Sequence, residues 1–397
     1  MSIKSKNKKK TNLLTRIIKD KKGLYVSTAM KIVLSIVLGI TTLTGSVLVV
    51  KDMVMPRTSE KIAEAFDNDY SSGASGGGSG GGSTTTRNGT VPEGCTYTSA
   101  GVSCTEMPFA PAEGDVYKEG DYVYTYGYYN GTLTWNAQTV DRTKSSYGII
   151  LSKIAGKPVT TMYSTFEECG SLTTAPTIPD GVTNMDSTFR GCSSLTTAPT
   201  IPDGVTNMES TFRGCSSLTT APTIPDNVTN MDHTFSGCTS LTTAPTIPDG
   251  VTDMGNTFSK CTGLTTAPVI PDSVTTMSCT FNGCTGLTTA PTIPNSVTNM
   301  SNTFDGCTGL TTAPTIPNGV TNMKNTFYGC TSLTSAPVIP GSVTNMNRTF
   351  EECTTLTGSL ECNANPKYYN ECLKGTQITS ITGSCSQATK DALLATK

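Results

Sequence analysis

The chain is poor in the residues that most catalytic sites require. It has one His (His233) and one Trp (Trp135) in 397 residues, and only 15% of its residues are charged. Chemistry that depends on several histidines is therefore excluded. The sequence contains no glycine-rich loop ahead of a basic helix and no nucleophile accompanied by a His. We expect a protein that is not an enzyme and that uses no cofactor and no bound metal.

The few charges are unevenly distributed. Residues 1–31 contain ten Lys or Arg and one acid, Asp20, whereas the rest of the chain contains 18 basic and 29 acidic residues. The acidic remainder argues against nucleic-acid binding. Residues 32–50 then carry no charge over 19 residues, about 28 Å as a helix, which is enough to cross a bilayer.

These two segments predict a single-pass protein of the cell membrane. By the positive-inside rule the N-terminus lies in the cytoplasm, and everything after the span is extracellular. A cleaved secretory signal is the alternative, but no small-x-small cleavage site follows the apolar run. The stretch DKKGLYVSTAMKIVLSIVLG, residues 20–39, together with VMP at 54–56, resembles the start of small pilin-like proteins of conjugative elements. That resemblance implies cleavage after Gly23.

Between the span and the repeats, two segments have recognisable local signals. Cys95 and Cys104 lie nine residues apart, and outside the cytoplasm such a pair is expected to close a small loop as a disulfide. Residues 115–141 alternate apolar and polar side chains on both sides of Asn130-Gly131, which predicts a β-hairpin. Its many tyrosines either stack on sugars or, as we favour, cap a neighbouring core.

A 23-residue unit dominates the rest of the sequence. One copy, LTTAPTIPDGVTNMDSTFRGCSS, covers residues 172–194. The cysteines recur with this period, and the Phe, Met and Leu series follow in the same register; the cysteines are Cys169, Cys192, Cys215, Cys238, Cys261, Cys284, Cys307, Cys330 and Cys353. A constant period with apolar residues at fixed phase indicates a solenoid, in which each unit is one coil stacked on the next. The residues expected to point inward are Leu172, Ala175, Ile178, Val182, Met185, Phe189 and Cys192.

Within a coil, residues 172–179 are expected to be extended. Pro176 and Pro179 lack N–H donors, so the strand there should be short. Residues 182–185 form a second short extended piece, and residues 187–192 (STFRGC) are expected to form one helical or 3₁₀ turn with Phe and Cys inward. The fold class is therefore a mainly β repeat solenoid with short helical turns, preceded by one transmembrane helix.

The cysteine and threonine series allow more than one interpretation. Buried thiols are the favoured reading of the cysteines, ahead of disulfides between coils and of a metal site. Cys362, Cys372 and Cys385 lie beyond the repeats, where any two of them are able to pair. The outward Thr173, Thr174 and their equivalents resemble the flat Thr arrays of ice-binding solenoids, although Thr as a soluble strand former is the simpler explanation.

Three positions per coil change their identity along the chain: the two after the Met and the one after the Phe. We call these positions the variable stripe. They should form the one surface whose chemistry differs from coil to coil, and drift without function is the alternative explanation. The candidate binding residues in it are Arg190, Arg213, His233, Asp305, Lys324, Tyr328 and Arg348.

The pattern IP-x-x-V-T-x-M-x-x-x-F-x-G-C-x-x-L resembles the BspA-type leucine-rich repeats of bacterial surface proteins. The resemblance implies adhesion to, or binding of, an extracellular protein or glycan. A structural appendage or envelope component, assembled through the pilin-like N-terminus, is the alternative function. The expected organisation is a basic cytoplasmic tail at 1–31, a transmembrane helix at 32–50, a spacer at 51–70, a Gly/Ser linker at 71–87, a β-hairpin N-terminal cap region at 88–147, the repeat solenoid at 148–353 and a C-terminal cap at 354–397.

Overall fold

The computed structural model describes residues 95–98, 101–104, 111–129 and 131–397. These residues belong to the second of two units, Gly80–Lys397, and the expected span at 32–50 lies outside them. Within the described ranges, no helix has the length and apolarity needed to cross a membrane.

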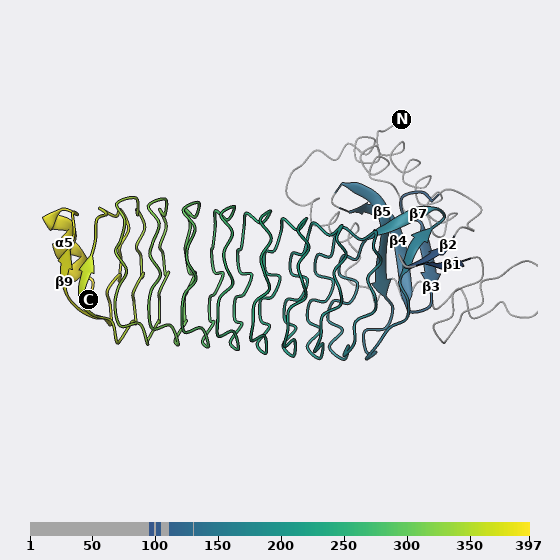
Figure 1. Cartoon of the computed structure of the whole chain (residues 1–397), viewed down its shortest axis with the longest axis horizontal. Coiled ribbons are helices and arrows are strands. Elements are labelled where there is room, and N and C mark those ends of the chain that lie inside the picture. Colours follow the sequence, from purple (N-terminus) through teal and green to yellow (C-terminus); the bar gives the residue numbers. More distant parts are fainter. Residues whose placement is uncertain (1–94, 99–100, 105–110, 130) are drawn as a thin grey trace, which may run out of the picture. The chain divides into compact units, whose positions relative to one another are not determined.

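A seven-stranded sheet precedes the repeats (Figure 1). Its order is β1-β2-β6-β7-β5-β4-β3, and β4 pairs antiparallel with β5 from Tyr122↔Thr139 to Tyr129↔Thr132. The hairpin expected around Asn130-Gly131 is thus present. The strands are β1 (Cys95–Thr98), β2 (Gly101–Cys104), β3 (Val116–Glu119), β4 (Tyr122–Tyr129), β5 (Thr132–Thr139), β6 (Leu151–Ile154) and β7 (Lys157–Thr161).

The aromatic side chains of this sheet cover the first coil. Tyr122, Tyr124 and Trp135 are almost fully buried, and the Tyr122 ring lies edge-on to Phe166 with centroids 6.1 Å apart. The buried indole of Trp135 donates a hydrogen bond to the Ile154 carbonyl at 3.2 Å. Because the end of a stack of coils exposes apolar side chains, these rings act as a cap. Most of the tyrosine run therefore forms the expected aromatic cap.

Consecutive coils are paired by very little regular β-strand. Two isolated parallel bridges recur in most coils, as at Thr174↔Thr197 and Asn184↔Asn207. Each predicted extended segment therefore contributes a single bridge. In the first segment this follows from the prolines, which have no N–H to donate to a β-ladder. The bridging asparagines also bond through their side chains: Asn207 Nδ2 donates to Asn184 Oδ1 at 3.2 Å.

Residues 185–192 carry most of the hydrogen bonds between coils. The N–H groups of Met185, Ser187 and Phe189 each donate to a carbonyl of the following coil, at 2.8 to 2.9 Å. The N–H groups of Thr188, Arg190 and Cys192 instead donate to the carbonyl three residues earlier, as Cys192 does to Phe189 at 3.0 Å. The expected helical or 3₁₀ turn is thus present only as separate turns with bonds from residue i to residue i−3, because Ser187 and Gly191 have positive φ (55° and 74°), which interrupts a right-handed helix.

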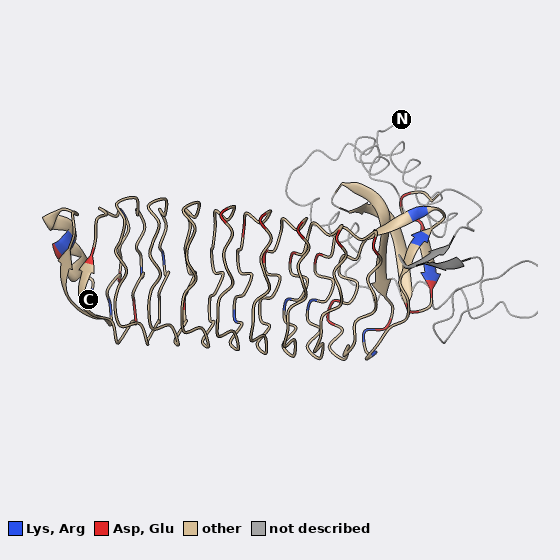
Figure 2. Cartoon of the chain, in the orientation of Figure 1, with Lys and Arg blue, Asp and Glu red and all other residues tan. Residues whose placement is uncertain are grey.

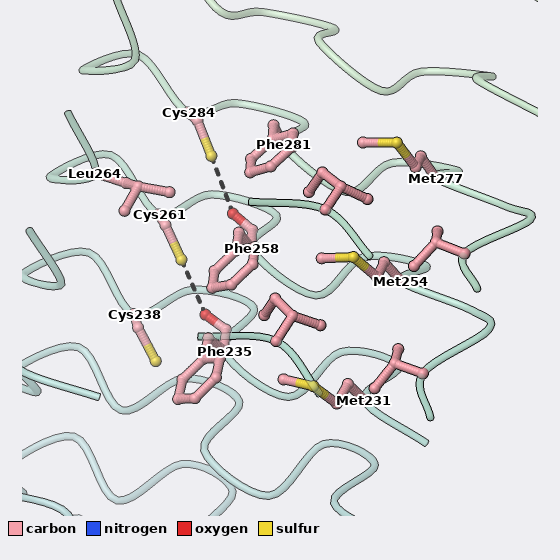
Figure 3. Close-up of a cluster of buried hydrophobic side chains, with 14 of the residues drawn as sticks. Met231, Phe235, Cys238, Met254, Phe258, Cys261, Leu264, Met277, Phe281 and Cys284 are labelled. Carbon is pink, nitrogen blue, oxygen red and sulfur yellow. Dashed lines mark hydrogen bonds between the residues drawn. The ribbon is translucent and has the colours of Figure 1, made fainter. Parts of the chain in front are cut away.

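The predicted inward set forms the core. Leu172, Val182 and Phe189 and their equivalents have no exposed surface, Ile178 is 3% exposed, and Ala175 is half-buried against them. Successive Phe rings stack with centroids 5.2 to 5.8 Å apart and interplanar angles of 3° to 9°. Figure 3 shows the parallel Phe, Met and Cys files of three coils. Each file is therefore continuous, and no coil has a core of its own.

Two polar groups lie inside this core. The thiol of Cys192 donates to the Phe166 carbonyl of the preceding coil at 3.1 Å, and its equivalents do the same (Figure 3). The Thr before each Phe is also fully buried; Thr234 donates through Oγ1 to the carbonyls of Met208 and Met231, both at 2.8 Å. These threonines are not among the residues expected to point inward, although a Thr precedes the Phe in every coil.

The last coils end in a different motif. Strand β8 (Thr357–Glu361) pairs in parallel with β9 (Gln377–Thr382), and helix α5 (Gln387–Leu394) follows. The Ser386 hydroxyl caps α5 by accepting from the Thr389 N–H at 3.1 Å. Leu393 of α5 is fully buried, so this helix packs against the C-terminal end of the stack.

The buried threonines should be essential for stability. We expect Thr234→Val to lower the free energy of unfolding by about 1–3 kcal/mol, because two buried carbonyls lose their shared donor. Thr242→Val is the matched control: this Thr is exposed in the following coil, and its loss should change stability by less than about 0.5 kcal/mol. Urea unfolding followed by circular dichroism measures both, and equal effects would contradict the assignment.

Candidate functional site

The variable stripe is continuous from coil to coil. Its side chains bond to their counterparts 23 residues away, which places them directly above one another. Arg190 Nη1 lies 2.9 Å from Glu167 Oε1, and Asn325 Nδ2 donates to Asn302 Oδ1 at 2.9 Å. Ser278 and Ser301 hydroxyls are 3.1 Å apart. Sequence drift at these positions is therefore constrained by neighbours as well as by any ligand.

The residues proposed from the sequence differ in how available they are. The side chains of Arg213 and Lys324 are exposed and make no ion pair with any described residue. Arg190 is held by Glu167, and the half-buried His233 places Nδ1 3.0 Å from Asp232 Oδ1. Desolvation raises the pKa of the half-buried Asp305.

Charge changes along the stripe. Acidic and basic side chains alternate in the first coils, in the order Asp186, Arg190, Glu209 and Arg213. The stripe positions from residue 278 to 302 carry Ser, Cys and Asn only. Figure 2 shows how sparsely charged residues are placed on the coils as a whole. Burial raises the pKa of Asp186, and the neighbouring Glu209 adds to the effect. The middle of the stripe is therefore a neutral surface of hydroxyl, thiol and amide groups.

The C-terminal end of the stripe is tied into an ionic cluster. Glu351 is 2% exposed, and its carboxylate accepts from Arg348 and, at 3.0 Å, from Lys374. Glu371 lies 2.9 Å from Lys374, and the Arg348 guanidinium sits 4.9 Å from the Tyr328 ring centroid. Burial raises the pKa of Glu351, but the hydrogen bonds from Arg348 and Lys374 outweigh it, so that the net pKa is lowered. Tyr328 and Arg348 are thus partly structural.

The second residue after each Met lies in the left-handed region of φ. The values run from 53° to 57° in the repeats, and the residues are Ser187, Ser210, His233, Asn256, Cys279, Asn302, Asn325 and Arg348. Asn and Gly tolerate this conformation, whereas other residues are strained in it. The outward side chain at this position can therefore differ from coil to coil, but each residue other than Asn carries a conformational cost.

The cysteine files are unsuited to chemistry. Desolvation raises the pKa of the buried thiols, to about 12 in Cys353, so they remain protonated at neutral pH and are poor nucleophiles. No group of three or more His, Cys, Asp or Glu suited to a metal ion occurs within the described ranges. In the backbone register of β1 and β2, Cys95 lies directly opposite Cys104. Paired positions on adjacent strands suit a disulfide, which remains a prediction.

The threonine surface differs in character from the stripe. Thr173, Thr174 and Thr177 are exposed, as are their equivalents along the coils. This surface hardly changes along the chain; Val269, 87% exposed, is one of its few departures. Being uniform, it offers a ligand no position that distinguishes one coil from another.

Comparisons with protein families describe the two parts of the chain separately. A model described as BspA type leucine rich repeat region, in six copies, matches residues 160–288 and 278–390. A second model, of a family of unknown function (DUF6133), matches residues 8–70, which lie outside the described residues. Neither model indicates a catalytic family. Among curated proteins, no match to this chain is found.

Solved structures with leucine-rich repeats resemble the chain at low sequence identity. A leucine-rich repeat protein from Bacteroides ovatus is 22% identical, with a TM-score of 0.47, over 67% of this chain and 78% of its own. A leucine rich cell surface protein from Faecalibacterium prausnitzii is 21% identical, with a TM-score of 0.37, over 72% and 98% of the two chains.

The ionic cluster makes stability depend on pH. Because the pKa of Glu351 is lower in the folded state, its contribution is fully present above its unfolded pKa and is lost as the pH falls through the folded value. We expect Glu351→Gln to cost about 1–2 kcal/mol at pH 7 and less at low pH. Glu352→Gln, at the adjacent exposed position, is the control. A cost for Glu351→Gln that did not shrink at low pH would contradict this account.

The row of residues with positive φ, the second after each Met, offers a site for a stabilising substitution. Cys279 has φ of 56° between Asn256 and Asn302 of the neighbouring coils. We expect Cys279→Asn to raise the free energy of unfolding by about 0.5–1 kcal/mol, because Asn adopts this conformation more readily. Thr265→Asn, at an exposed position without positive φ, should not stabilise. Thermal unfolding of the two variants tests the difference.

Proposed function

We propose that this chain, which belongs to the BspA-type leucine-rich repeat family, is a membrane-anchored surface protein that binds an extracellular protein or glycan through its variable stripe. Repeat proteins of this kind are generally binding proteins rather than enzymes, and surface members are consistent with adhesion. The observation that carries the proposal is the contrast between a uniform threonine surface and a stripe whose side chains change in every coil. Specific recognition needs such positions, because identical coils offer a ligand no single register.

The chemistry of the stripe favours a long polar ligand. Its middle offers hydroxyl and amide groups over several coils, and its two ends carry charges, including the unpaired Arg213 and Lys324. An extended protein segment or a glycan presents hydroxyl and amide groups that match such a row. Charged residues near the rim of a binding surface mainly guide association and set the orientation of the ligand.

Anchoring to the membrane is inferred from the sequence alone. The basic residues before residue 32 and the uncharged residues 32–50 support a single span with a cytoplasmic N-terminus. The Gly/Ser linker at 71–87 would then hold the repeats away from the bilayer, at about 20–25 Å for a random coil. The alternative remains an appendage or envelope component built through the pilin-like N-terminus.

Binding through the stripe is tested most cleanly at its free charges. An array of glycans and extracellular-matrix proteins, probed with residues 88–397, identifies a ligand. Arg213→Glu and Lys324→Glu are then expected to weaken its binding at least several-fold, because neither change breaks an ion pair among the described residues. Thr242→Glu, on the threonine surface, should leave the affinity unchanged. Binding that is lost with Thr242→Glu but kept in both stripe variants would overturn the proposal.

The two possible forms of the N-terminus predict different mature proteins. A monomeric anchor keeps residues 1–31, whereas pilin-like processing after Gly23 gives a chain that starts at Leu24. We expect the unprocessed start. N-terminal sequencing of the protein isolated from membranes decides between the two, and a start at Leu24 would transfer support to the appendage.

A further inference from the structure

Two cysteines near the C-terminus occupy core positions that the repeats fill with isoleucine. The inward Ile recurs every 23 residues up to Ile339, and the same spacing then reaches Cys362 and Cys385. The parallel bridge Ile339↔Cys362 shows that Cys362 continues the file in space. Cys362 is fully buried and Cys385 is 5% exposed. The exchange of Ile for Cys therefore occurs in two successive rungs, where the stack of coils ends.

The backbone holds these two cysteines next to each other. The Cys385 N–H donates to the Cys362 carbonyl at 3.2 Å, and the Cys362 N–H donates to the Thr382 carbonyl at 3.0 Å. Their thiols lie within hydrogen-bonding reach of one another. Residues on adjacent rungs are about 4.8 Å apart, which is inside the range of Cα separations that a disulfide spans.

The other buried cysteines are held differently. In the repeats each thiol is directed at a backbone carbonyl of the preceding coil, as Cys330 is at Phe304 (3.1 Å) and Cys353 at Phe327 (2.9 Å). Cys372 has the Thr349 side chain as its hydrogen-bond partner. Each of these thiols has a partner other than a second thiol. Cys362 also donates to a carbonyl, that of Ala364 at 3.4 Å, but it has the Cys385 thiol within reach as well.

We infer that Cys362 and Cys385 are a disulfide site, which locks the C-terminal cap when the protein reaches an oxidising compartment. The reaction needs a thiol–disulfide oxidant, R–S–S–R. One cysteine thiolate attacks it, releasing R–SH and forming a mixed disulfide, and the second thiolate then displaces the other R–SH. Two protons and two electrons pass to the oxidant, and one S–S bond joins Cys362 to Cys385.

The position of the bond determines its effect. Cys385 directly precedes Ser386, the N-cap of α5, so the disulfide ties the start of this helix to the last rungs of the core. Terminal coils of a solenoid have a neighbour on one side only and are the first to open. Because both sulfurs are covered in the closed cap, oxidation takes place during folding or when the cap opens.

The test uses the full chain, refolded in a buffer of oxidised and reduced glutathione. Free thiols are alkylated, and the protein is digested with trypsin without reduction. We expect a linked pair of peptides, 349–367 and 375–390, that separates on reduction. Since peptide 349–367 also contains Cys353, Cys362→Val must abolish the link and Cys353→Val must preserve it. Alkylation of Cys362 and Cys385 in the oxidised wild type, or a link that survives Cys362→Val, would overturn the inference.

A stability measurement gives a second readout. Oxidation should raise the midpoint of thermal unfolding of the wild type by on the order of 5 °C. The double variant Cys362→Val/Cys385→Val, which restores β-branched aliphatic side chains to the file, should lose most of this response, because among the expected disulfides only Cys95–Cys104 remains to form. An equal response would place the stabilising disulfide elsewhere and contradict the inference. Exposure to an oxidant in the organism rests on the proposed surface location, but neither readout requires a ligand, so failure of the binding proposal leaves this test intact.

Discussion

Hydrogen bonding and stacking between consecutive coils is the interaction on which the rest of this structure depends. A single coil has too few apolar side chains to form a core, and its backbone is mostly turns, whose N–H groups and carbonyls need partners outside the coil. Alternate N–H groups of residues 185–191 find these partners in the next coil. Inside the core, the Thr and Cys side chains donate to carbonyls that also accept a backbone N–H, so that these side-chain polar groups are buried without being left unpaired.

This dependence on neighbours makes the two ends the weak points of the solenoid. At the N-terminal end, the rings of Tyr122 in β4 and of Tyr147 cover Phe166, which otherwise has a stacking partner on one side only. At the C-terminal end several structural features together cover the last coil: the parallel pair β8 and β9, the helix α5, the buried carboxylate of Glu351 and the adjacent Cys362 and Cys385. A file of identical side chains cannot end by itself, and both ends therefore depart from the repeat.

Stacking also decides which surface residues are free to vary. A position whose side chain enters a file must keep its size, whereas an outward position need only be compatible with its backbone and its two neighbours. The residues of the stripe differ in how strongly their neighbours hold them. Arg190 and Arg348 are engaged by carboxylates within the protein, while Arg213 and Lys324 project without an ionic partner among the described residues. A binding role is therefore concentrated on fewer residues than the variation alone indicates.

The sequence by itself determined the period, the inward Leu, Ile, Val, Met, Phe and Cys positions, and the hairpin of β4 and β5, because each depends on a local pattern or on phase. It did not reveal that residues 187–192 form separate turns instead of one continuous helical or 3₁₀ turn, because the positive φ of Ser187 and the bonds of alternate N–H groups to the next coil have no local sequence signal. Tertiary structure alone decided that Thr234 and its equivalents are buried donors, which stripe residues are paired, and that Cys362 has Cys385, rather than Cys372, as its neighbour. These features depend on contacts 23 or 26 residues apart, which form only when the coils stack.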